Sequence, residues 1–186
     1  GAPGAGGGPR GDDPRQRDAA DGGHQPRRGR GGRGLSDDPA VAARGQALAA
    51  LARREHSRKE LERKLTARGH DAAIVGEALD KLADQHLQDD DRFIEVFVRS
   101  RIGRGQGPVR IAQELRQRGI PDEQVRTALA AVEEDWDAAA RSVLNRQFRA
   151  PAADMKTRAR QMRFLAARGF SAETIRRLLR ATVEDD

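Results

Sequence analysis

Leu65-Thr66-Ala67-Arg68-Gly69 recurs fifty residues later as Leu115-Arg116-Gln117-Arg118-Gly119, and again as Leu165-Ala166-Ala167-Arg168-Gly169. In each copy the leucine can pack inward on the last turn of a helix, and the arginine complements the negative carboxyl end of that helix. The glycine supplies the left-handed conformation that commonly ends a helix. The element therefore predicts a helix that ends at the same point in three successive repeats.

Apolar residues on both sides of these turns keep the same fifty-residue register. Upstream, Leu61 corresponds to Ile111, and Leu48 to Val98 and Phe148; downstream the matches are Val75, Val125 and Ile175, then Leu79, Leu129 and Leu179. The apolar positions have helical spacing, and β-branched residues show no alternating pattern, so no strand is predicted. The fold class expected is all-α, with three tandem three-helix repeats that resemble helix-turn-helix units. The predicted helices are 41–54, 57–68, 71–86, 90–102, 108–118, 121–132, 134–148, 155–168 and 171–183.

Capping residues support these helix starts. Asp71 and Ser171 stand where the third helix of the first and third repeats should begin, and their side chains can accept backbone N–H bonds there. Ser57 and Glu60 form a capping-box pattern, and Pro121 suits a first helical position because its missing N–H costs little. No proline falls in the interior of a predicted helix.

Composition divides the 186 residues into a tail and three repeats. Residues 1–40 hold 12 of the 20 glycines and five of the eight prolines, with Leu35 as the only large aliphatic residue. We expect this Gly/Pro/Arg-rich tail to be disordered, because it cannot bury enough apolar surface to offset its ordering entropy. Its run Arg27–Arg33 resembles segments that bind single strands loosely, although a solvated linker is the favoured interpretation. The repeats are then 41–90, 91–140 and 141–186, and with only 3% aromatic residues they suit small cores shared between neighbours.

Several classes of protein are disfavoured by the sequence. The chain has no cysteine, which excludes disulfides and cysteine-ligated metal sites. No apolar run is long enough to span a bilayer and no signal segment opens the chain, so we expect a cytoplasmic protein without a membrane contact.

Catalytic and cofactor motifs are also missing. The four histidines show no HExxH spacing, and Gly103–Pro108 lacks the strand and the GKS or GKT ending of a phosphate loop. Asp89–Asp91 lacks the spacing of an EF-hand and fits the start of a helix better. We therefore expect no enzyme, no metal and no cofactor.

The net charge of +6 is unevenly distributed. Residues 141–186 contain eleven basic and five acidic residues, whereas the two preceding repeats are nearly neutral. The candidate contacts in this third repeat are Arg141, Arg146, Arg149, Lys156, Arg158, Arg160 and Arg163. A second basic stretch contains Arg99, Arg101, Arg104, Arg110, Arg116 and Arg118.

Glu114 is the only acid in this second stretch, and Arg104 lies in a glycine-rich connector that would let the backbone approach a phosphate. Both clusters predict either an acidic partner, such as nucleic acid, or ordinary solvated faces. With so few aromatic residues, contacts to nucleic acid should be electrostatic and salt-dependent.

Several sequence segments together resemble those of the RecX family, the regulators of the RecA recombinase. They are Arg54-Glu55-His56-Ser57-Arg58-Lys59-Glu60-Leu61, Leu87-Gln88-Asp89-Asp90-Asp91-Arg92-Phe93, Gly105 through Ile120, Asp135-Trp136 and Arg163 through Phe170. The resemblance covers about residues 41–183. One departure is His86, which stands where the family often has an aromatic residue.

The resemblance implies an elongated, curved array of three repeats that binds the RecA–DNA filament, along its helical groove. It implies a role in recombination, DNA repair and the SOS response, by inhibition of ATP hydrolysis, strand exchange and co-protease activity. It identifies no catalytic residue, and we expect a monomer. The basic clusters are the candidate contacts to DNA phosphates or to acidic filament surfaces. The alternative is an autonomous helical DNA-binding protein that acts through these patches without a recombinase.

Overall fold

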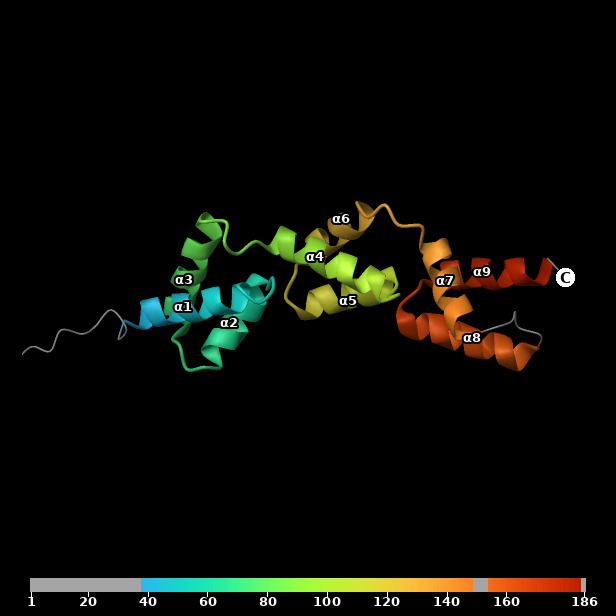
Figure 1. Ribbon diagram of the computed structural model, residues 1–186, viewed down its shortest axis with the longest axis horizontal. Helices are drawn as coiled ribbons and strands as arrows, with labels where there is room; N and C mark the ends of the chain where they lie inside the picture. Colours follow the sequence, from blue (N-terminus) through green and yellow to red (C-terminus); the bar gives the residue numbers. More distant parts are fainter. Residues whose placement is uncertain (1–37, 149–153, 185–186) are drawn as a thin grey trace, which may run out of the picture. The chain divides into compact units, whose positions relative to one another are not determined.

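The computed structural model describes residues 38–148 and 154–184, and every regular element in them is an α-helix (Figure 1). These helices group into three tandem repeats of three, which confirms the all-α prediction and the repeat pattern. None of the helices described is long and apolar enough to cross a membrane. The helices are α1 (Pro39–Leu51), α2 (Arg58–Thr66), α3 (Ala72–Asp84), α4 (Asp90–Gly103), α5 (Pro108–Gln117), α6 (Asp122–Ala130), α7 (Trp136–Gln147), α8 (Met155–Arg168) and α9 (Ala172–Glu184).

The middle helix of each repeat ends in the same hydrogen-bonded turn. Gly69, Gly119 and Gly169 have φ angles of 89°, 84° and 84°, which confirms the left-handed conformation predicted for them. In the first repeat the Gly69 amide donates to Thr66 O (2.9 Å) and the next amide donates to Leu65 O (3.3 Å). The other two repeats have the equivalent pairs of bonds. This pattern is the Schellman motif, which satisfies carbonyls that would otherwise be left unpaired at a helix end.

The side-chain caps predicted for α2, α3 and α9 are also present. Asp71 accepts a hydrogen bond from the Ala73 amide (2.8 Å), and Ser171 Oγ accepts one from the Thr174 amide (3.0 Å). Ser57 and Glu60 form both bonds of the capping box. These bonds begin helices at the positions where the sequence predicted them.

The first helix begins two residues earlier than predicted. Asp38 accepts a hydrogen bond from the Ala40 amide (2.9 Å), and Pro39 occupies the first turn, where its fixed φ angle favours a helix. The predicted tail therefore extends too far, because residues 39 and 40 are helical. The prediction of disorder for residues 1–37 lies outside the described residues.

Each repeat has its own small apolar core. Leu65, Leu115 and Leu165 are completely buried, one in each cluster, as the turn element predicted. Trp136, at the start of α7, packs against both the second and the third cluster. The three cores thus consist of different residues, and Trp136 packs against the cores of both the second and the third repeat.

Candidate nucleic-acid and partner interface

The glycine turn of the third repeat is bound by the start of α5 in the second repeat. The amides of Gly107 and Val109 donate to Arg168 O (2.8 Å) and Gly169 O (3.0 Å). Unpaired donors at one helix start therefore meet unpaired acceptors at another helix end. Gly107 permits this approach, because a Cβ atom there would lie 2.4 Å from Gly169 O.

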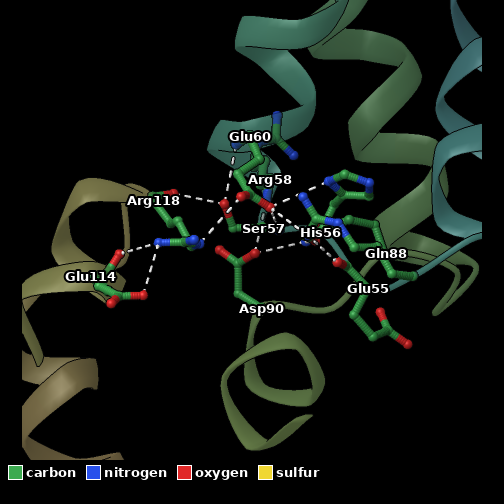
Figure 2. Close-up of polar contacts among 10 residues, drawn as sticks. Glu55, His56, Ser57, Arg58, Glu60, Gln88, Asp90, Glu114 and Arg118 are labelled. Carbon is green, nitrogen blue, oxygen red and sulfur yellow. Dashed lines mark hydrogen bonds and ion pairs between the residues drawn. The ribbon is translucent and has the colours of Figure 1, made fainter. Parts of the chain in front are cut away.

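The first and second repeats are joined by equivalent elements (Figure 2). Ser57 Oγ, at the start of α2, donates to Arg118 O at 2.6 Å, and the Arg63 guanidinium donates to Gln117 O at 2.9 Å. Position 57 corresponds to position 107 in the fifty-residue register. In both junctions the start of one middle helix thus donates hydrogen bonds to carbonyls at the glycine turn of the next repeat.

Carboxylates neutralise most of the arginines between residues 99 and 118. Glu114 accepts hydrogen bonds from Arg101 Nε (2.8 Å) and Arg110 Nε (3.1 Å), and Arg118 Nη1 lies 3.9 Å from it. Burial alone would raise the pKa of Glu114, but these bonds and the nearby positive charges lower it below its ordinary value. The guanidinium groups of Arg101 and Arg118 also lie 4.3 and 4.5 Å from the centre of the Phe97 ring. These three arginines therefore have structural partners in or beside the junctions.

Two more arginines of this stretch form exposed ion pairs, Arg99 with Glu95 and Arg116 with Asp122. Arg104 differs, because its side chain makes no ion pair with any of the residues described. It lines a pocket of about 410 Å³ together with three other arginines and Glu55. The other arginines of this pocket are Arg54, Arg101 and Arg118. Arg104 is thus a cation that lines a cavity and has no carboxylate partner among the described residues.

The cations of α8 are arranged differently from those of the middle repeat. Lys156, Arg160 and Arg163 are exposed, and their i, i+4, i+7 spacing places them on one face of the helix. Within the described part of the chain they have no carboxylate partner, and Arg160 lies 5.6 Å from the Phe148 ring centre. Arg158 is half-buried on another side of α8. The structure therefore brings three of the predicted cations into one row, and no described carboxylate pairs with them.

The remaining candidates of the third repeat are dispersed. Arg141 contributes to the low pKa of Asp137, whose main cause is a hydrogen bond from Arg177. Arg146, near the end of α7, forms no ion pair with a described residue, and Arg149 lies outside the described residues. Arg141 and Arg146 lie on α7, and no contact groups them with the cation row of α8.

An exposed apolar row on α8 was not predicted. Met155 is 80% exposed and Met162 is 41% exposed. Together with the half-buried Ala159 and the exposed Ala166 they follow an i, i+4, i+7, i+11 spacing, beside the cation row. This spacing is visible in the sequence, so the apolar row could have been predicted from it. The outer surface of α8 therefore combines a cationic row with an apolar one.

Nothing in the described residues resembles a metal centre, since no three metal-binding side chains gather there. His56 is buried, with its Nδ1 atom 3.3 Å from Glu60 Oε2. Its pKa is lowered by burial and by the charges of Arg54 and Lys64. His56 thus belongs to the polar cluster at the first junction (Figure 2).

Comparison with known proteins matches all three repeats to one family. The models described as the first, second and third three-helix domains of RecX match residues 43–82, 89–129 and 133–179. The regulatory protein RecX of Halorhodospira halophila is 53% identical over 146 residues, which cover 78% of this chain and 91% of that protein. The regulatory protein RecX of Chromohalobacter salexigens is 47% identical over 133 residues, 72% of this chain and 88% of that relative.

The fold has a solved counterpart. The crystal structure of RecX from Lactobacillus salivarius superposes with a TM-score of 0.67 at 22% identity, over 78% of this chain and 97% of that one. This similarity shows the fold, and the sequence relatives show the family. The chain belongs to the RecX family of regulatory proteins.

Proposed function

We propose that this protein binds the RecA–DNA filament and inhibits the ATPase, strand-exchange and co-protease activities of the recombinase. Membership of a family whose curated members are named regulatory proteins supports a regulatory role. It acts as a cytoplasmic monomer without a catalytic residue, in recombination, DNA repair and the SOS response. The family resemblance supports the recombinase as partner, and the unpaired cations of α8 support the choice of contact surface.

The exposed surface of α8 is the observation on which this proposal depends. Lys156, Arg160 and Arg163 keep their charges free for an acidic partner, whereas most arginines of the middle repeat are neutralised internally. Phosphates alone would explain the cation row, but exposed methionines beside it favour an additional apolar contact. A filament of protein and nucleic acid offers both kinds of surface.

Arg104 provides a second anion contact, in the pocket near the first junction. The two contacts lie in different repeats of one chain, so binding at the first raises the effective concentration of the second. Weak individual contacts can then add to a stable complex.

A recombinase ATPase assay on single-stranded DNA tests this proposal. We expect wild-type protein to lower the rate, and Lys156→Ala/Arg160→Ala/Arg163→Ala to require roughly tenfold or more protein for half-inhibition, from three exposed charge contacts. A matched control is Arg53→Ala/Lys81→Ala/Arg126→Ala, which removes the same charge from exposed positions of the first two repeats. No effect of wild-type protein at stoichiometric concentration would overturn the proposal.

A second candidate function, direct binding to DNA without a recombinase, is favoured by the same cation row. If three phosphates are contacted, the logarithm of affinity for single strands should fall with the logarithm of salt concentration with a slope near −2, about −0.7 per phosphate. Binding to bare DNA as tight as binding to the filament would favour this second candidate. A clear preference for the filament would favour the first.

A further inference from the structure

A groove between α4 and α6 of the second repeat lies apart from the α8 surface and shares no residue with the Arg104 pocket. Its volume is about 610 Å³, within the usual range for binding sites. Ile94 and Val98 form a buried floor, and Ile102, Ala128 and Val132 form half-buried walls. The groove is therefore apolar inside and accessible from solvent.

Aromatic residues in α4 account for this groove. Phe93 and Phe97 occupy the positions at which α1 has Ala43 and Ala47, fifty residues earlier. The two alanines are completely buried, and α1 lies directly against α3. In the second repeat the larger rings fill the centre, and α4 makes few direct contacts with α6. A space thus remains between the first and third helices of this repeat, where the first repeat has direct packing.

The rim of the groove is acidic, although the chain has a net charge of +6. Four carboxylates and one guanidinium line it, those of Asp91, Glu95, Glu133, Glu134 and Arg99. Arg99 already pairs with Glu95, and Asp91 accepts a hydrogen bond from Gln124 Nε2 at 2.6 Å. Glu133 and Glu134 have no cationic partner in the part of the chain described. The local charge is therefore opposite to that of the protein as a whole.

We propose that this groove binds an amphipathic helix of a partner protein that carries lysine or arginine beside its apolar face. Apolar side chains at i, i+3, i+4 and i+7 would enter the groove, as in other complexes of a helix with a groove. The flanking cations would then face Glu133 and Glu134. This docking uses no residue of α8, so it can fail or succeed independently of the proposed function.

The acidic rim and the apolar interior of the groove favour a cationic amphipathic helix over the other possible occupants. Residues 1–37 are basic but contain Leu35 as their only large aliphatic residue, so they lack the side chains to fill an apolar groove. The outer surface of α8 has cations and methionines, which makes a second copy of this chain the competing occupant. The test therefore has to distinguish a partner helix from self-association.

The probe is a 14-residue peptide of leucine and lysine, with leucine at i, i+3, i+4 and i+7, titrated into the full-length protein by calorimetry. A peptide with glutamate in place of lysine is its counterpart. We expect saturable 1:1 binding of the lysine peptide, and binding of the glutamate peptide at least tenfold weaker. Ala131→Trp, at an exposed position lining the groove, should abolish binding by filling the space.

Charge reversal provides the matched comparison. Glu133→Lys/Glu134→Lys should weaken binding of the lysine peptide roughly tenfold. Glu77→Lys/Asp84→Lys, the same change on exposed positions of α3, should leave it unchanged. Absence of binding to wild-type protein, or equal effects of the two double variants, would overturn the proposal. Self-association in sedimentation velocity that Ala131→Trp abolishes would assign the groove to a second copy, and would also overturn it.

Discussion

The three turn glycines have the same backbone conformation but different surroundings, so their replacement by alanine gives a graded test of the repeat junctions. A Cβ atom on Gly69 would meet nothing within 4 Å. On Gly169 it would lie 2.6 Å from the Arg110 backbone nitrogen, and on Gly119 it would lie 2.4 Å from Lys59 Cβ. The first substitution therefore strains only its own turn, whereas the other two also force a junction apart.

The expected losses follow from these two effects. The left-handed conformation costs an alanine about 1–2 kcal/mol relative to glycine, and this term is common to all three variants. Overpacking against a backbone or a Cβ atom adds about 1–3 kcal/mol. Gly69→Ala should thus lower the free energy of unfolding by about 1–2 kcal/mol, and Gly119→Ala and Gly169→Ala by about 2–5 kcal/mol.

Urea unfolding measures these losses, with helical circular dichroism as the global signal. Trp136 is the only tryptophan and packs against the second and third cores, so its fluorescence should respond to Gly169→Ala most strongly. Equal losses for all three variants would show that the turns are not packed against neighbouring repeats, and would refute the account of the junctions.

Two further predictions concern ionisable groups at the junctions. Burial, with the charges of Arg54 and Lys64, lowers the pKa of His56 below 6.5, so the folded state binds fewer protons and the free energy of unfolding should decrease as pH falls below about 6.5. In urea unfolding across pH, His56→Gln should remove this dependence, and an unchanged profile would contradict the assignment. Glu114→Gln should cost about 1–3 kcal/mol, because it leaves Arg101 without its carboxylate in a partly buried site. Since the pKa of Glu114 is lowered, wild-type protein should lose the same contribution as pH falls below the ordinary value of 4.5, and the variant should not.

The fold was predictable from the sequence because its signals are local. A glycine turn, a capping box and the spacing of apolar residues each act within one helix and its ends, and they recur at fifty residues. The early start of α1 depends on Asp38 and Pro39, which composition alone had assigned to the tail. The start of α1 is therefore set by local capping at Asp38 and Pro39, and the glycine and proline content of the preceding segment did not reveal it.

The candidate site was less predictable, because charge neutralisation depends on tertiary contacts. The pairs of Arg99 with Glu95 and of Arg110 with Glu114 are four residues apart and visible in the sequence. The contact of Arg101 with Glu114 spans thirteen residues, and the junction bond from Ser57 to Arg118 spans sixty-one. The sequence located the basic clusters, but the structure was needed to separate paired arginines from the free row on α8.

Co-sedimentation with RecA filaments on single-stranded DNA tests the central claim most directly. At stoichiometric protein and moderate salt, wild-type protein and Arg53→Ala/Lys81→Ala/Arg126→Ala should sediment with the filament. Lys156→Ala/Arg160→Ala/Arg163→Ala should remain largely in the supernatant. Wild-type protein that stays in the supernatant would contradict binding to the filament, and equal sedimentation of all three proteins would contradict the role assigned to α8.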